Sequence, residues 1–574
     1  MSAARRLAAV AVIVVTGLGC SNPTYPGGGD TQIAVPPHPG QATAQTEPVE
    51  TGPTAGDEEV QFTVSLNLRD EDGMTALLER LNDPASLDFH QYISATAFGE
   101  RFGLPSEDVA RVVGWLESAG LRAAAVPQRT SISVSGSASS VNQLLGITLH
   151  DWSSPNGERF HRPSGLPAVP AHLSDKVAAV LGLDTEPVLR PAFGGILASG
   201  VPSGGLRPNT VARAYEIDPL HAAGMRGEGQ VVAIVSFDTF TPSDVDLFDA
   251  REGVAAPRVE IVRVPGAADE PGSGTGEVAL DIQVIRGIAP QARIINYEGP
   301  NTANGFAALM ARIVADGLAE IVSISWGLCE KYSSPSALRA EEREFDAAFA
   351  AGLSVFVASG DDGAYGCRRV AISDDPFNRD LSQDSQWPST SASTIGVGGT
   401  FLSVREDGTY ISEAGWEEPL GGAGGGGGLS TVVDRPSWQE GVGVDNAASN
   451  GMRQVPDVAG PSDPSSGFLV VYTEPGQGVV EGQVGGTSAA APFWAASMAL
   501  TRQMAGTEGV DSLGALAPTL YQIAAEQPAG AVFHDVIRGG NLLFEAGPGW
   551  DYSTGLGSPR VAPLARAIID FLKR

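Results

Sequence analysis

A serine in a glycine-bounded corner is the first residue that could do covalent chemistry. Ser488 lies in the segment GGTSAAAP, residues 485–492, between a Gly-Gly-Thr corner and a run of small residues. Such a corner can present a nucleophile at the start of a buried helix, but a serine hydroxyl needs a base to take its proton. The chain has only seven histidines, and none lies between His221 and His534. A base of another type is therefore expected.

Two carboxylates could replace histidine. Glu277 and Asp281 lie four residues apart in the segment GTGEVALDIQVIRGIAP, so both project from one face of a predicted helix. Glu277 would accept the Ser488 proton, and Asp281 would orient Glu277 and tune its pKa. A carboxylate base works best near its own pKa, which predicts activity in acid. The same spacing is common on solvated helices, but here it stands where a Ser-His-Asp enzyme would carry its histidine.

The elements that must position these residues alternate in type. Continuous apolar segments such as QVVAIVSF, ARIINYEG, EIVSISWG and LSVFVASGDDG are separated by helical stretches such as NGFAALMARIVADG. Strands buried on both faces and joined by helices predict an α/β fold with a doubly wound parallel sheet. Ligands of such sheets bind beyond the carboxyl ends of the strands, where SWG and SGDDG lie.

A smaller domain precedes this sheet. It begins with the alternating strand VQFTVSLNL and continues through three helices, a hairpin, a fourth helix and a second hairpin. Ser106 is expected to cap the third helix, which has acids in its first turn. Helices on an antiparallel sheet predict an α+β domain over residues 57–183. Residues 21–56 are predicted to be a disordered linker, and residues 184–206 a connector of low order.

The N-terminus resembles an export signal. Arg5 and Arg6 precede the apolar run Leu7–Val15, and the predicted signal covers residues 1–20. Its end, TGLGCSN, resembles a bacterial lipoprotein processing site in which Cys20 would carry the lipid; ordinary signal cleavage nearby is the alternative. We therefore expect a secreted protein or an outer-membrane lipoprotein of a bacterium, which meets a membrane only through that lipid.

Composition excludes one class of partner. The 574 residues include 67 acidic and 36 basic ones, for a net charge of -31, whereas binding nucleic acid needs a basic face. Such a surface suits acid, where protonation of carboxylates reduces self-repulsion; better solubility is the alternative explanation. Outside the signal, Cys329 and Cys367 suggest one disulfide in an exported protein, with two separate buried thiols as the alternative.

Taken together, the motifs resemble the sedolisin family of serine-carboxyl peptidases, and most closely its kumamolisin branch. The segments that carry the resemblance are GEVALDIQ, SISWG, ASGDDGA, GGGGGLS, RQVPDVAGPSDPSSGF and GGTSAAAPFWA, in the family's order. Residues 57–183 resemble the family's activation domain. The resemblance implies a subtilisin-like catalytic domain over residues 207–574, with Glu277, Asp281 and Ser488 as its triad.

The resemblance also assigns a role to Asp361, in SGDDG. Asp361 would line the oxyanion hole together with the backbone N–H of Ser488. A carboxyl group can donate to an oxyanion only when it is protonated, which again predicts activity in acid. A loop-capping aspartate is the alternative.

Two segments resemble the edges of a peptide-binding cleft. Ser325, Trp326 and Gly327 would form one edge for an extended substrate, and the glycine-rich run containing Gly426 and Gly427 would form the other. Core packing for Trp326 and a flexible loop for the glycines are the alternatives.

The C-terminal stretch from FHDVIRGG to AGPGWDYSTGLGSP resembles the family's calcium site and implies one bound Ca²⁺ ion. Calcium prefers hard oxygen ligands. The implied ligands are the carboxylates of Asp535 and Asp551 and the backbone carbonyls of Val536, Gly547 and Gly549. Without the resemblance, the same pattern indicates only a tight turn.

One position departs from the family. The first strand of kumamolisin-like catalytic domains ends with a glutamate that extends the carboxylate network, and this chain has Ser236 there. Asp238 is a candidate to compensate. The departure leaves the triad intact and affects the expected pH profile and activity level.

The sequence therefore predicts an acid-acting endopeptidase, made as a self-processing monomeric proenzyme, that hydrolyses proteins or peptides through an acyl-enzyme on Ser488. The activation domain would inhibit it until low pH weakens carboxylate contacts between the domains, and cleavage within residues 184–206 would release the mature enzyme. A tripeptidyl exopeptidase is one alternative, which would need a cleft blocked at one end. A catalytically silent peptide-binding surface protein is another, which the retained catalytic residues disfavour.

Overall fold

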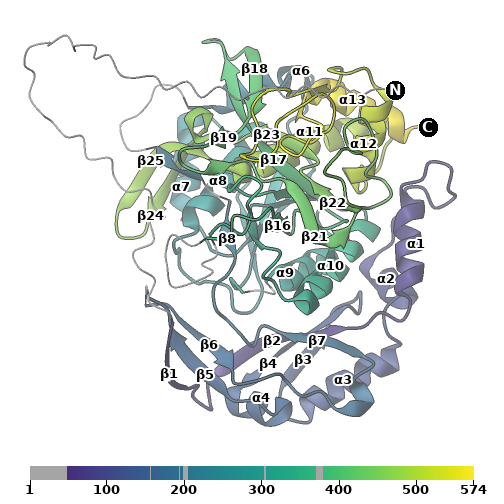
Figure 1. The fold of residues 1–574 in the computed structure, drawn as a ribbon, viewed down its shortest axis with the longest axis vertical. Helices are drawn as coiled ribbons and strands as arrows, with labels where there is room; N and C mark the ends of the chain where they lie inside the picture. Colours follow the sequence, from purple (N-terminus) through teal and green to yellow (C-terminus); the bar gives the residue numbers. More distant parts are fainter. Residues whose placement is uncertain (1–47, 156, 193, 198–204, 303–304, 370–378) are drawn as a thin grey trace, which may run out of the picture. The chain divides into compact units, whose positions relative to one another are not determined.

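The computed structural model describes residues 48–574 except 156, 193, 198–204, 303–304 and 370–378 (Figure 1). The predicted signal over residues 1–20, the lipidation candidate Cys20 and the predicted linker up to residue 47 lie outside the described residues. The described chain belongs to one compact unit. Among its helices, none combines the length and apolar character that a bilayer crossing requires.

The N-terminal domain is built on a four-stranded antiparallel sheet. Its strand order is β3-β4-β2-β7, and helices α3 (Ser106–Glu117) and α4 (Ala138–Leu145) pack against it (Figure 1). Alternate residues of β2, from Val60 to Leu66, join the core with the apolar face of α3. The strands are β2 (Glu59–Leu66), β3 (Arg122–Ala125), β4 (Ser131–Ser137) and β7 (Val177–Leu181).

A second sheet in this domain corrects the predicted linker. β1 (Val49–Pro53) pairs with β5 (Leu149–Ser153), which pairs with β6 (Arg159–Pro163). Residues 49–53 of the predicted linker are therefore a strand. β1 lacks apolar alternation, and its backbone groups are satisfied by pairing with β5. The predicted cap of α3 is also wrong: Pro105 takes the cap position, and Ser106 is the first helical residue.

Two helices of the N-terminal domain extend onto the catalytic domain. Helices α1 (Glu71–Leu81) and α2 (Ala95–Arg101) contribute side chains such as Leu77 and Phe98 to a core shared with α9 and α10. The segment between them, residues 82–93, is bonded to the catalytic domain: Ile93 N–H donates to Ala350 O at 2.9 Å. We call α1, α2 and residues 82–93 the arm.

The catalytic domain contains the predicted parallel sheet. Eight strands run in the order β11-β12-β10-β13-β15-β17-β18, with β23 beside β17, and only the β17–β18 pairing is antiparallel. The strands are β10 (Val231–Ser236), β11 (Glu260–Arg263), β12 (Arg293–Glu298), β13 (Ile321–Ile324), β15 (Ser354–Ala358), β17 (Ile395–Val404), β18 (Tyr410–Gly415) and β23 (Val458–Pro461).

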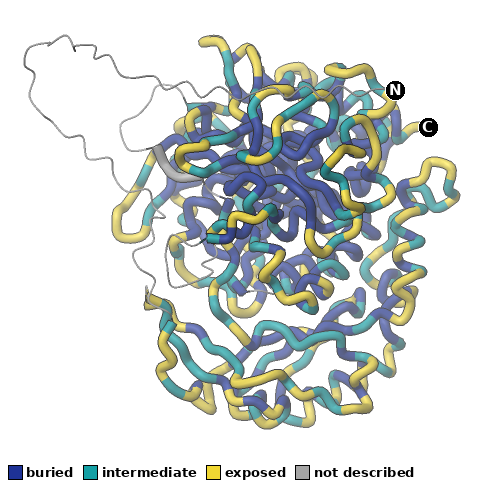
Figure 2. The backbone as a smooth tube through the Cα atoms, in the orientation of Figure 1, coloured by how far each residue is buried: buried dark blue, intermediate teal, exposed yellow. Residues whose placement is uncertain are grey.

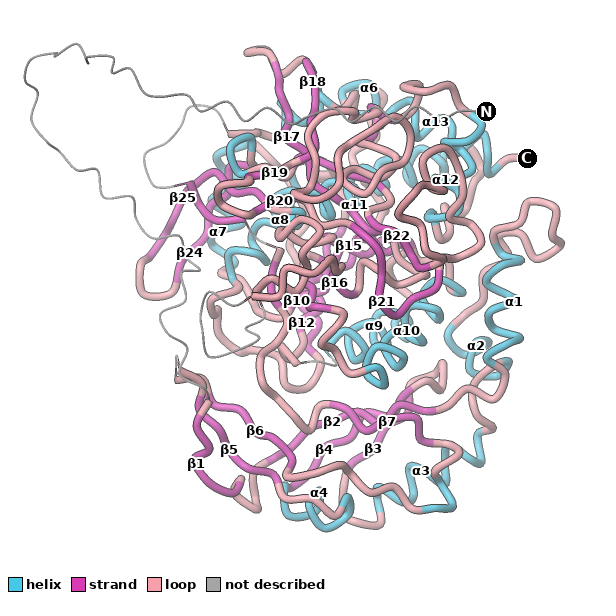
Figure 3. Tube along the Cα trace, in the orientation of Figure 1, coloured by secondary structure: helices cyan, strands magenta, loops and turns pink. Residues whose placement is uncertain are grey.

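Helices cover both faces of this sheet, so its middle strands are buried on both sides (Figure 2). Val232 and Ile234 of β10 pack with α8 (Thr275–Ile288) and α11 (Thr487–Thr507). Ala233 and Val235 point the other way, toward α9 (Gly305–Asp316) and α10 (Pro335–Ala350), which lie side by side (Figure 3). The nucleophile helix and the predicted base helix therefore share one face.

The remaining helices of the catalytic domain are α5 (Pro208–Ala214), α6 (Asp218–Ala222), α7 (Pro242–Glu252), α12 (Leu516–Glu526) and α13 (Val561–Leu572). Its shorter strands are β8 (Arg190–Pro191), β9 (Gly194–Leu197), β14 (Trp326–Cys329), β16 (Gln386–Trp387), β19 (Glu417–Glu418), β20 (Ala423–Gly424), β21 (Gly428–Asp434), β22 (Met452–Val455), β24 (Phe468–Glu474), β25 (Gly478–Gly485), β26 (Phe533–His534) and β27 (Ser558–Pro559).

Candidate active site

Ser488 lies in the first turn of α11 and is fully buried. Gly486, immediately before the helix, has φ 115°, which a residue with a side chain rarely adopts. The Ser488 N–H donates to the carbonyl oxygen of Ala192 at 3.2 Å, and the Ser488 hydroxyl donates to the same oxygen. The candidate nucleophile thus lies against a peptide carbonyl of the chain's own connector.

Glu277 and Asp281 lie on α8, and both side chains are buried. Burial raises the pKa of Glu277 well above its ordinary value, and the neighbouring carboxyls of Asp281 and Asp361 raise it further. The hydroxyls of Ser488 and Ser325 lower that pKa in part. Burial likewise raises the pKa of Asp281. Each carboxyl of the pair therefore holds its proton up to a higher pH than a solvated carboxyl would.

Ser325 has a role that its sequence position did not reveal. Its hydroxyl donates to Asp281 Oδ1 at 2.6 Å and lies 3.3 Å from the carbonyl oxygen of Ser488. The sequence predicts Ser325 at the substrate edge alone. Its side chain also fixes one oxygen of Asp281 beside the nucleophile helix.

Asp361 follows β15, on a loop against the start of α11. Its Oδ1 accepts from the N–H of Thr487 at 2.8 Å and from the Thr487 hydroxyl at 3.0 Å. Its Oδ2 has no hydrogen-bond partner among the described residues. Burial raises the pKa of Asp361 to about 6, so in acid Oδ2 carries a proton that it can donate. The two hydrogen bonds from Thr487 thus leave Oδ2 as the free carboxyl oxygen of Asp361. The sequence predicts no such role for Thr487.

The connector passes along the predicted substrate edge. Pro191 lies opposite Trp326, and Arg190 opposite Gly327, in the antiparallel pairing of β8 with β14. Ala192 N–H donates to Ser325 O at 2.9 Å. A cleft of about 380 Å³ is lined by this part of the connector, by β14 and by the Asp361 loop.

The predicted low order of residues 184–206 therefore needs correction. β8 pairs with β14 on one side of Ala192, and β9 pairs with β25 on the other. The two short strands are ordered by backbone pairing with catalytic-domain edges, a feature that side-chain periodicity does not encode.

The glycine run packs closely against neighbouring backbone. Gly426 N–H donates to Gly360 O at 2.6 Å, and a Cβ on Gly426 would lie 1.9 Å from Ser359 O. A Cβ on Gly427 would lie 2.0 Å from Tyr552 O. Gly426 thus allows close packing on the strand end before Asp361, and Gly427 allows it on Tyr552; their role as a substrate edge stays a prediction.

Ser236 and Asp238 stand apart from the triad. The Ser236 hydroxyl donates to Asn296 Oδ1 at 2.6 Å. Asp238 accepts three backbone N–H groups, from Thr239 at 2.8 Å, Gly272 at 2.9 Å and Gly274 at 2.7 Å. Its carboxylate is thus occupied by the turn that precedes α8, so it supports the helix of Glu277 and does not replace the family's glutamate.

The predicted calcium ligands lie together near the C-terminus. Asp535 Oδ1 accepts from Gly549 N–H at 3.1 Å, and Asp551 Oδ2 accepts from Gly547 N–H at 3.0 Å. The Thr554 hydroxyl approaches the carbonyl of Val536 at 3.5 Å. Two carboxylates thus face one glycine-rich loop, which is a donor set of the hard-oxygen type that calcium uses.

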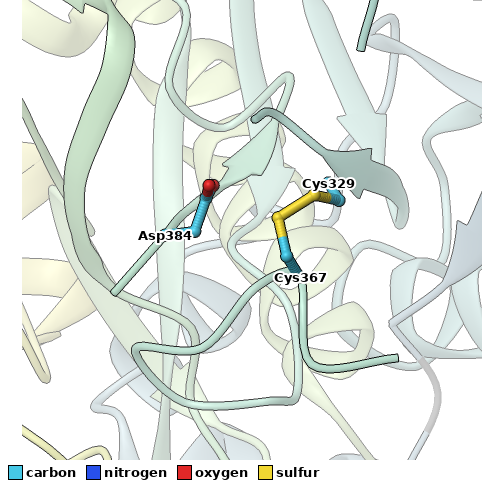
Figure 4. A group of neighbouring side chains, drawn as sticks. All are labelled: Cys329, Cys367 and Asp384. Carbon is cyan, nitrogen blue, oxygen red and sulfur yellow. A yellow bond between two sulfur atoms is a disulfide. The ribbon is translucent and has the colours of Figure 1, made fainter. Parts of the chain in front are cut away.

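The structure joins Cys329 and Cys367 by a disulfide (Figure 4). Asp384 lies beside the two sulfur atoms, and its buried carboxyl accepts no hydrogen bond from any described residue. Burial and the nearby Glu330 raise the pKa of Asp384 to about 7. Because the sulfur atoms are bonded to each other, this trio offers no thiolate ligands for a metal.

Comparisons with known proteins identify both domains of the chain. Residues 47–186 match the family model of the pro-kumamolisin activation domain, and residues 266–517 match that of the subtilase family. Kumamolisin from Bacillus sp. (strain MN-32) is 35% identical over 91% of this chain and 94% of its own length. Sedolisin from Pseudomonas sp. (strain 101) is 29% identical over 90% of this chain and 88% of its own length.

Two further similarities extend the comparison. Tripeptidyl-peptidase 1 from Canis lupus familiaris is 26% identical over 91% of this chain and 94% of its own length. Among solved structures, Pseudomonas sedolisin, a serine-carboxyl proteinase in complex with pseudo-iodotyrostatin, matches with a TM-score of 0.55 and 28% identity. That match covers 64% of this chain and 99% of the other.

Proposed function

Because the chain belongs to the sedolisin family of serine peptidases and carries its activation domain, we propose that it is an acid-acting endopeptidase that first cleaves its own connector. The observation that carries this proposal is the position of the Ala192 carbonyl. That carbonyl accepts from the N–H and the hydroxyl of Ser488, on a chain paired with β14. The proposed scissile bond is Ala192–Phe193.

The buried groups account for the chemistry. The Ser488 oxygen attacks the carbonyl carbon while its proton passes to Glu277, which Asp281 tunes. The developing oxyanion accepts from the Ser488 N–H and from the protonated Oδ2 of Asp361. Collapse of the intermediate breaks the C–N bond, and Glu277 returns the proton to the leaving amine. Water then hydrolyses the acyl-enzyme by the same proton transfers.

We also propose one calcium ion in the C-terminal loop. The carboxylates of Asp535 and Asp551 would hold it together with backbone carbonyls of Val536, Gly547 and Gly549. The proposal is supported by the two carboxylates, which accept from backbone N–H groups of one glycine-rich loop. The ion would stabilise this loop and take no part in proton transfer.

The relatives include tripeptidyl peptidases, but the path of the connector favours cleavage of internal bonds. Described residues pair with the catalytic domain on both sides of Ala192. A chain that continues in both directions is the substrate form of an endopeptidase.

The test is a pH series on the proenzyme lacking residues 1–20, with and without calcium. Self-processing would be followed on gels, the new N-terminus sequenced, and proteolysis of a denatured protein measured. We expect cleavage in acid that declines as pH rises through about 6, the pKa of Asp361, with Phe193 as the first new residue. Ser488→Ala should abolish it, whereas Ser497→Ala, which removes another buried hydroxyl of α11, should not.

Other outcomes would favour other functions. Optimal activity near neutral pH would contradict the carboxylate base. Release of tripeptides alone would favour the exopeptidase. A folded protein without cleavage at any pH would favour a peptide-binding surface protein.

A further inference from the structure

A single asparagine holds the connector four residues before the proposed scissile bond. Leu189 N–H donates to Asn301 Oδ1 at 2.8 Å, and Asn301 Nδ2 donates to Leu189 O at 3.0 Å. Leu189 is buried and Asn301 half-buried. One carboxamide thus satisfies both backbone groups of one residue, as a neighbouring strand would.

The position of Asn301 explains this contact. It follows β12, at the same sheet edge as Ser325 after β13 and Asp361 after β15. The described pairing with β14 reaches only Arg190 and Pro191. Asn301 therefore continues the backbone recognition by one residue, using a side chain beyond the described strand pairing.

We propose that Asn301 is a specificity-determining residue that holds the backbone of the fourth residue on the acyl side of the scissile bond. The preferred substrates are then chains that continue at least four residues before the cleaved bond, whatever their side chains. An enzyme that removes tripeptides has no fourth residue on that side, so Asn301 would have no backbone to hold. This inference rests on the proposed function and names its substrate class.

The alternative role is a latch that holds only the uncleaved connector. The two roles differ after processing. A latch affects how fast the proenzyme matures, whereas a substrate contact remains in the mature enzyme and depends on peptide length. The test must therefore use mature enzyme.

The experiment combines three peptides with three enzymes. The first peptide is blocked and contains Leu-Arg-Pro-Ala-Phe within a longer chain. The second carries N-methyl-leucine at the same place. The third begins at des-amino-arginine, which leaves no carbonyl or N–H in the place of the leucine. Wild type, Asn301→Ala and Asn301→Leu would be matured with immobilised wild-type enzyme that is then filtered away. Asn209→Ala, an exposed asparagine on α5, is the matched control.

For wild type and the control variant we expect kcat/KM to fall about tenfold when the leucine N–H is methylated, and similarly on truncation. Both Asn301 variants should cleave the long peptide about tenfold more slowly than wild type and the short peptide at nearly the wild-type rate. Their kcat/KM should be the same for the methylated and the unmethylated long peptide. Neither Asn301 variant should recover the wild-type rate on the long peptide.

Three results would overturn the inference. Equal losses on long and short peptides would mean a structural role, and a slower maturation with unchanged peptide preference would mean a latch. A wild-type enzyme that cleaves all three peptides equally would show that the fourth residue is not held. If folded wild type cleaves no peptide at any pH, the proposed function fails and this inference fails with it.

Discussion

Asp361 presents its two carboxyl oxygens to different surroundings. Oδ1 accepts two hydrogen bonds from Thr487, so the proton of the neutral acid belongs on the unpartnered Oδ2. Burial raises the pKa of Asp361 to about 6. The neutral donor form is therefore present below that pH and is lost as pH rises through it.

Replacing Asp361 with asparagine keeps a hydrogen-bond donor at this position but removes the group that titrates. An asparagine can accept from Thr487 through its oxygen and donate through its nitrogen at any pH. We expect kcat of Asp361→Asn to fall about ten- to hundredfold, and the decline of kcat/KM near pH 6 to move to higher pH. The measurement is a pH–rate profile from pH 3 to 8. An unchanged alkaline limb in the variant would assign that limb to another group.

Residue types were predictable, but their contacts were only partly so. The four-residue spacing of Glu277 and Asp281 puts them on one helix face, and Ser488 and Asp361 follow recognisable motifs. The contacts of Ser325 with Asp281 and of Asn301 with Leu189 join segments 44 and 112 residues apart. No local pattern encodes such a pairing, because the fold alone brings the segments together.

The start of α8 depends on a carboxylate from a neighbouring strand end. Helix α8 has no side-chain cap of its own, and Asp238 binds the N–H groups of the turn that leads into it. That turn sets the orientation of Glu277, three residues beyond Gly274. Asp238 is thus a positioning residue for Glu277, the proposed base.

In Asp238→Asn, an amide NH₂ would face the Gly274 N–H, or the Gly272 and Thr239 N–H groups after a flip. We expect a stability loss of about 1–2 kcal/mol and a fall in kcat of about tenfold, with KM little changed. Thermal unfolding and steady-state kinetics would be measured beside Asp246→Asn, an exposed aspartate of α7. Loss of stability without loss of kcat would restrict Asp238 to a structural role.

Elements with a strong periodic pattern were predicted, and elements that depend on pairing were missed. The apolar strands β10, β12, β13 and β15 are continuous in the sequence and central in the sheet. By contrast β1, β8 and β9 are short and are held by backbone bonds to edges. The burial of acids on α10, such as Glu341 and Glu344, was not predicted, because the sequence pattern of that helix is polar.

The contact between the two domains contains groups with opposite responses to pH. Glu344 of α10 accepts from Gln128 and Ser131 of the N-terminal domain, and burial raises its pKa. A raised carboxyl pKa means that docking gains stability from this group in acid and loses it as pH rises. The expectation that acid weakens carboxylate contacts therefore does not fit Glu344.

The pKa shift of His90, in the arm, has the direction that favours release of the arm in acid. Burial among Phe89 and Tyr92 lowers its pKa to about 4 from an ordinary 6.5. The imidazole of His90 binds a proton more readily when the arm is released than when it is docked. The docking equilibrium constant therefore falls as pH falls from 6.5 toward 4, by a factor that approaches about ten per pH unit for this group. We expect His90→Asn, which tolerates the φ of 54° and does not titrate, to flatten that dependence.

The measurement is hydrogen exchange of residues 82–93 in the Ser488→Ala proenzyme across pH 4 to 7, corrected for intrinsic exchange. Wild-type His90 should give protection that falls steadily in acid, and His90→Asn protection that changes little. Equal pH dependence in both proteins would assign the acid response to other interface groups.

With Ala192 placed on Ser488, the first substrate in the proposed self-processing is intramolecular. Its effective concentration is fixed by the fold, and effective molarities of well-oriented groups reach about 10⁵ M or more. The half-time of the first turnover should then be the same at any protein concentration. After the proposed cut, the fragment ending at Ala192 would be held only by ordinary binding, so dilution would decide whether it rebinds and continues to inhibit.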